Sequence, residues 1–163
     1  MHRKTLVYLM AFGSAVFVAG CGDDDKTPAG PVTETFRASL DGASERPTPR
    51  TSSATAIANF TLRRDTLYWT IALTNATNVT ASHIHVGTAD VAGGIILPLT
   101  PPVSNTAIAG FITRTTFAPP SAPNQALTFD GLLDLLRNGG AYVNVHTTTF
   151  PGGEIRGQVV KIT

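Results

Sequence analysis

The chain has 163 residues, of which 42% are apolar, 14% charged and 7% aromatic, and its formal net charge at pH 7 is +1. This composition excludes a disordered acidic or basic tail protein. The near-neutral charge argues against a nucleic-acid binder that works through bulk charge, and the length allows one domain with its own core.

The first twenty residues have the three parts of a secretory signal. A basic start at residues 2–4 precedes an apolar run at 6–18, and the small pair Ala19 and Gly20 follows. The apolar run is shorter than the roughly 20 residues that a helix needs to cross a membrane. We therefore expect a signal peptide over residues 1–20 and no permanent transmembrane anchor.

Cys21 is the only cysteine in the sequence and follows directly on this signal. The segment Val18-Ala19-Gly20-Cys21 resembles the bacterial lipobox, which implies cleavage before Cys21, a diacylglyceryl group on its thiol and an acylated amino terminus. An ordinary cleavage site with a free thiol is the alternative. Residues 22–32 are polar and rich in Pro and Gly, as in a flexible linker. We expect a protein tethered in the bacterial cell envelope, and Gly22 after the cysteine favours the outer membrane.

From residue 33 onward, apolar and polar residues alternate in short runs that Gly, Pro, Asn or Asp interrupt. This period of two is typical of a sandwich or barrel. Strands are predicted at 35–40, 54–62, 67–73, 81–86, 95–99, 107–113, 141–147 and 154–162. The leucines of residues 128–139 instead follow a helical stripe, with Thr128 as N-cap. We expect residues 33–163 to form an all-β Greek-key sandwich or barrel of about eight antiparallel strands with one short helix.

Three histidines follow the signal, and their spacing predicts a shared site. His83 and His85 are two residues apart on one predicted strand, so they share a face, with Cβ atoms roughly 7 Å apart. His146 shares the face of its own strand with other polar residues. If the predicted strands at 81–86, 141–147 and 154–162 are neighbours, one polar cluster forms. Its members are His83, His85, His146, Tyr142, Asn144, Glu154 and Arg156.

Two interpretations of this cluster remain open. Imidazole suits copper and zinc, and three nitrogens leave a position for water or substrate, so His83, His85 and His146 could hold a metal ion with the other four residues in support. The alternative is a structural polar network in which the rings hydrogen-bond backbone or carboxylate groups. No catalytic residue is assigned, because the sequence has no Gly-x-Ser-x-Gly elbow and no glycine-rich phosphate loop.

Several segments resemble the CHRD domain, a module first named from chordin and found singly in many bacterial secreted proteins and lipoproteins. They are ASHIHVG at 81–87, GGII at 93–96, YVNVHT at 142–147 and FPGGEIRGQ at 150–158, with LDGASERP at 40–47 resembling the opening strand and turn. The resemblance covers about residues 33–163. It implies an all-β extracytoplasmic module without an agreed enzymatic activity. We expect a lipid-anchored, non-catalytic binding module whose partners are the membrane and a protein or glycan.

The segment HIHVG at 83–87 is also similar to the His-x-His strand of copper/zinc superoxide dismutases, which are eight-stranded Greek-key barrels. On that analogy, His83, His85 and His146 would hold copper. The chain has no fourth copper histidine, no bridging histidine with a zinc cluster and no cysteine pair. The likeness therefore implies a copper- or zinc-binding protein more readily than a working dismutase.

Overall fold

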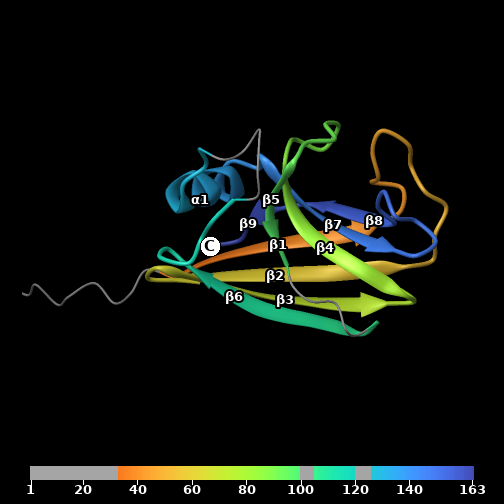
Figure 1. Cartoon of the computed structure of the whole chain (residues 1–163), viewed down its shortest axis with the longest axis horizontal. Coiled ribbons are helices and arrows are strands. Elements are labelled where there is room, and N and C mark those ends of the chain that lie inside the picture. Colours follow the sequence, from red (N-terminus) through yellow and green to blue (C-terminus); the bar gives the residue numbers. More distant parts are fainter. Residues whose placement is uncertain (1–32, 100–104, 120–125) are drawn as a thin grey trace, which may run out of the picture.

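The computed structural model describes residues 33–99, 105–119 and 126–163 (Figure 1). The predicted signal, Cys21 and the linker lie outside these residues. The strands are β1 (Thr33–Asp41), β2 (Thr55–Arg63), β3 (Thr66–Thr74), β4 (Val79–Val86), β5 (Ile95–Pro98), β6 (Ala107–Thr113), β7 (Ala141–Thr147), β8 (Ile155–Gln158) and β9 (Val160–Lys161), and the helix is α1 (Phe129–Arg137). None of the helical structure in the described part of the chain has the length and hydropathy to span a bilayer.

The strands form a single antiparallel sheet that curls into a half-barrel (Figure 1). Along the sheet the order is β5-β4-β7-β8-β1-β2-β3-β6, and β9 continues beside β1. Strands that are distant in the chain are therefore neighbours, as β4 and β7 or β1 and β8. The all-β prediction with one short helix is confirmed. The last predicted strand is divided into β8, which pairs with the end of β1 at Asp41, and β9, which pairs with the middle of β1 at Phe36 and Arg37.

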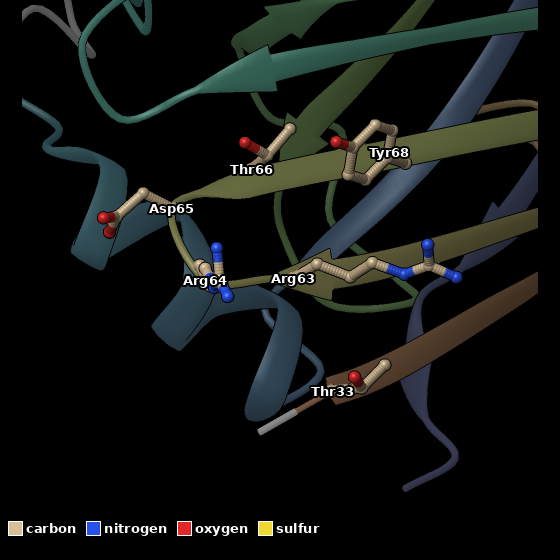
Figure 2. A pocket seen from close by; sticks show the side chains of 6 residues that line it. All are labelled: Thr33, Arg63, Arg64, Asp65, Thr66 and Tyr68. Carbon is tan, nitrogen blue, oxygen red and sulfur yellow. The ribbon is translucent and has the colours of Figure 1, made fainter. Parts of the chain in front are cut away.

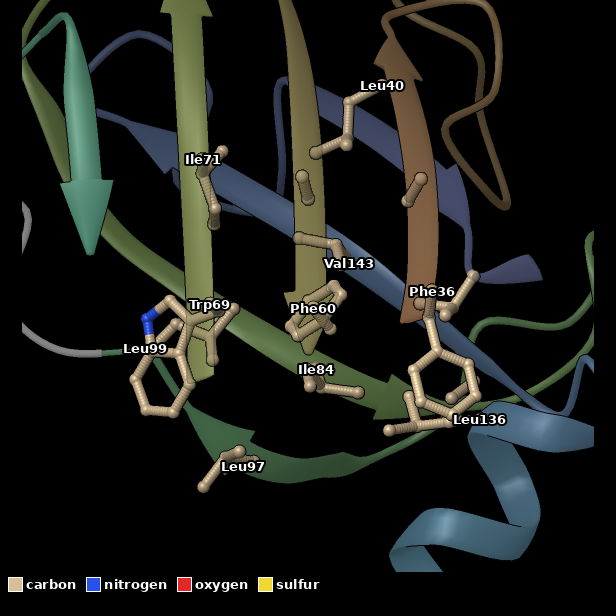
Figure 3. Packing of buried hydrophobic residues seen from close by; sticks show 14 of the residues in the cluster. Phe36, Leu40, Phe60, Trp69, Ile71, Ile84, Leu97, Leu99, Leu136 and Val143 are labelled. Carbon is tan, nitrogen blue, oxygen red and sulfur yellow. The ribbon is translucent and has the colours of Figure 1, made fainter. Parts of the chain in front are cut away.

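The core lies inside the curl, where the two flanks of the sheet face each other. Inward side chains alternate with outward ones along β1, β2 and β3, because successive residues of a strand point to opposite faces. Phe60 and Ile71 from this flank meet Ile84 of β4 and Val143 of β7 (Figure 3). All four side chains are buried. The apolar residues of the alternating pattern thus form the hydrophobic core inside the curled sheet.

Helix α1 packs beside the start of β1. The hydroxyl of Thr128 accepts a hydrogen bond from the backbone N–H of Gly131 at 3.1 Å, which is the predicted N-cap. Leu136 on the apolar stripe is buried next to Phe36 of β1 (Figure 3). The leucine pattern of the sequence therefore identified both the helix and the face that it buries.

Candidate metal centre

The three predicted histidines lie together on the outer face of the sheet. β4 carries His83 and His85, β7 carries His146, and the two strands pair antiparallel. Their alternation sends Ile84 and Val145 into the core and the imidazoles outward. One ligand nitrogen from each histidine lies within 4.8 Å of the other two. The shortest separation is 3.1 Å, between Nδ1 of His83 and Nε2 of His146.

Backbone carbonyls fix the tautomers of two of these rings. Nδ1 of His85 lies 2.9 Å from the carbonyl oxygen of Gly93, and Nδ1 of His146 lies 3.0 Å from that of Pro151. A carbonyl oxygen only accepts, so both Nδ1 atoms carry the proton and both Nε2 atoms carry a lone pair. The lone pair of His146 Nε2 accepts from Nδ1 of His83. Histidines that bind metals almost always donate their other ring N–H to such an acceptor. Nε2 of His85 is buried and has no hydrogen-bond partner within the described residues.

Burial keeps the three imidazoles neutral. Loss of solvent is the main cause that lowers the pKa of His83 from 6.5 to about 4, and the neighbouring His146 and His85 contribute to this shift. Burial also lowers the pKa of His85 and of His146, although each donates to a carbonyl that opposes the shift. A metal ion binds the unprotonated imidazole. The cluster is therefore in its ligating form at neutral pH.

Two of the predicted supporting residues form a stack with His85. The ring of Tyr142 is parallel to the His85 ring, with 4.9 Å between centroids and 13° between planes. The Tyr142 hydroxyl accepts from the N–H of Gly93 at 3.1 Å and donates to its carbonyl at 3.2 Å. The guanidinium carbon of Arg156 lies 3.4 Å from the Tyr142 ring centroid. This stack fixes the orientation of His85.

The other two predicted supporting residues contact the connection between β1 and β2. Nδ2 of Asn144 donates to Oε2 of Glu45 at 3.4 Å, and Glu154 accepts from the Ser52 hydroxyl at 2.6 Å. Glu45 is only 2% exposed, and burial raises its pKa. Asn144 thus lies opposite His83 in the pairing of β4 with β7, and the side chains of Asn144 and Glu154 both form hydrogen bonds to this connection.

Sequence reasoning missed Glu45 and the carbonyls of Gly93 and Pro151. Every residue has a carbonyl group, so residue type gives no signal for a carbonyl that orients an imidazole. Glu45 belongs to the segment that resembles the opening CHRD turn, but its distance along the chain from Asn144 hides their contact.

An open hollow lies at the other end of the sheet, beside the turn between β2 and β3 (Figure 2). Its lining residues are Thr33, Arg63, Arg64, Asp65, Thr66 and Tyr68. All of them are exposed or half-exposed. None of the residues that line the hollow is a buried polar group. The hollow therefore lacks the fixed, buried ligand atoms that the histidine cluster provides.

The fold and the cluster define a curled β domain with three imidazoles on its outer face. The chain belongs to the CHRD domain family, whose model matches residues 36–159. The matched range includes the three histidines and the four predicted supporting residues. A comparison with curated proteins found no match.

Proposed function

We propose that this protein is a lipid-anchored, extracytoplasmic binding module of the bacterial cell envelope, held at the outer membrane through Cys21, and that its ligand is one copper or zinc ion. Membership of the CHRD family supports a binding role. The observation that carries the choice of ligand is the convergence of the nitrogens of His83, His85 and His146 within 4.8 Å. No catalytic residue enters the proposal.

Metal binding requires little rearrangement of the cluster. Nε2 of His85 and Nε2 of His146 already present lone pairs, while Nδ1 of His83 must transfer its proton to Nε2 and give up its contact with His146. Metal–nitrogen bonds of about 2.0–2.1 Å place the nitrogens roughly 3.4 Å apart. Small side-chain rotations achieve this from the present spacing. Three nitrogens leave one position of a tetrahedral ion open.

The second candidate is a metal-independent module that binds a protein or glycan, with the histidines as a structural network. It is favoured by the hydrogen bonds that join His83 to His146 and two of the rings to backbone carbonyls. The dismutase-like alternative gains no separate support, since the sequence lacks most of the ligand pattern of those enzymes.

Metal titration separates the two candidates. The chain is purified without a polyhistidine tag, analysed for metals, and titrated calorimetrically with copper and zinc beside the triple variant H83A/H85A/H146A. Arg37→Gln, on the exposed face of β1, is the control. Near one ion per chain with sub-micromolar affinity, lost in the triple variant and kept in the control, supports the metal site. No binding by the wild type, or full binding by the triple variant, refutes it.

The anchor is tested separately in a bacterial host. Mass spectrometry of the amino-terminal peptide should find acylated Cys21, and Cys21→Ser should release the protein from the membrane fraction. A free Cys21 thiol in a membrane-free protein would contradict the anchor and leave the metal proposal standing.

A further inference from the structure

A buried guanidinium, that of Arg156 on β8, lies on the far side of Tyr142 from the histidine cluster. Arg156 is 2% exposed, and its Nη2 donates to the carbonyls of Thr88 at 2.7 Å and Val91 at 2.9 Å. No carboxylate in the described part of the chain forms an ion pair with it at salt-bridge distance. The carboxylates that act on it electrostatically are Glu45 and Asp90. Burial disfavours the charged form of Glu45, and Asp90 is exposed and pairs with Arg46. Arginine keeps its proton under all ordinary conditions, so this positive charge is permanent and little compensated.

The charge acts on the histidines through a three-layer stack. β7 lies between β4 and β8, so Arg156 of β8 and His85 of β4 are on opposite sides of Tyr142. The separations are 3.4 Å from Arg156 to the Tyr142 centroid and 4.9 Å from there to the His85 centroid. The guanidinium is therefore roughly 8 Å from the His85 ring, where a buried charge still has a substantial effect.

We infer that Arg156 is a specificity-determining residue, which favours Cu(I) over Zn(II) and Cu(II) at the site formed by His83, His85 and His146; this inference rests on the proposed metal-binding function. Repulsion between the guanidinium and a bound ion grows in proportion to the charge of the ion. A divalent ion therefore loses twice as much binding free energy as a monovalent one.

The ligand set reinforces this discrimination. Imidazole binds copper as well as zinc, and the three nitrogens are neutral, so no thiolate or carboxylate ligand within the cluster offsets the second charge of a divalent ion. Zn(II) also requires a fourth ligand. Cu(I) accepts three nitrogens alone, which is the number that the cluster provides.

The test measures the ratio of two affinities on the same protein. The full chain and its R156Q and R156K variants are titrated with Cu(I) under anaerobic conditions and with Zn(II), each in competition with a coloured chelator. R156Q should raise the Zn(II) affinity relative to the Cu(I) affinity about tenfold, whereas R156K, which keeps the charge, should stay near the wild-type ratio. A general loosening of the site changes both affinities and largely cancels in the ratio.

A second pair of variants avoids any change of a buried residue. Ala89 is exposed and lines a small hollow together with Arg156. Ala89→Glu places a carboxylate near the guanidinium, and Ala89→Gln adds a similar shape without the charge. The glutamate variant should shift the ratio in the same direction as R156Q by a smaller factor, and the glutamine variant should leave it unchanged.

The outcomes separate this inference from the proposed function. A wild-type chain that binds neither ion refutes both. A wild-type chain that binds, with the same ratio in R156Q and in Ala89→Glu, refutes the role of Arg156 alone. A shifted ratio in both charge-changing variants, with R156K and Ala89→Gln at the wild-type ratio, supports it.

Discussion

Glu34 joins three elements at the end of the half-barrel opposite Asp41. Arg137 of α1 donates to its carboxylate from Nε at 2.9 Å and from Nη2 at 2.5 Å, and Nζ of Lys161 on β9 lies 2.9 Å away. The Glu34 side chain is 11% exposed. The hydrogen bonds from Arg137 are the main cause that lowers its pKa from 4.5 to about 2. Replacing Glu34 with Gln should therefore destabilise the domain.

The size of the effect follows from the pKa. Each unit of difference between the folded and unfolded pKa corresponds to about 1.4 kcal/mol. The full difference would give about 3 kcal/mol, and partial exposure of Arg137 and Lys161 reduces this to about 2 kcal/mol. Because the folded pKa is the lower one, the stabilisation is complete above pH 4.5 and disappears as the pH falls through about 2.

Urea unfolding followed by tryptophan fluorescence measures this effect, since Trp69 is the single tryptophan and is buried. Glu34→Gln should lose about 2 kcal/mol at pH 7, and its difference from the wild type should close as the pH falls from 4.5 to about 2. The control is Asp134→Asn, because the exposed Asp134 also contacts Arg137 and should matter little. A gap between Glu34→Gln and the wild type that is independent of pH would refute the reasoning.

Three more results are expected from local geometry. Gly153→Ala should lower the free energy of unfolding by roughly 1–3 kcal/mol in thermal unfolding, because Gly153 has φ +123° and a Cβ there would lie 2.7 Å from Oδ1 of Asn144. The control Gly152→Ala should be near neutral, because a Cβ at Gly152 would have no atom within 4 Å. Thr128→Ala should cost about 1 kcal/mol through loss of the N-cap, and the serine variant should recover most of it in urea unfolding. The rise in Tm caused by zinc should persist below pH 6.5 and vanish near the His83 pKa of about 4; a rise already lost at pH 6.5 would contradict this.

The sequence alone determined the local structure of this protein. Alternation of apolar and polar residues identified the strands, and the leucine stripe after Thr128 identified α1 and its buried face. The same alternation placed His83 and His85 on one face. Each of these features depends on residues within a few positions of one another, so a short segment of the sequence is enough to predict it.

The tertiary structure decided which strands are neighbours, and with them the site. Nothing local in the sequence requires β4 to pair with β7, yet this pairing brings His146 within 3.1 Å of His83. The burial of Glu45 against Asn144 likewise depends on segments from distant parts of the chain. The choice of neighbours depends on how all the apolar faces are buried together in one curled sheet, and that property belongs to the whole chain and to no single segment.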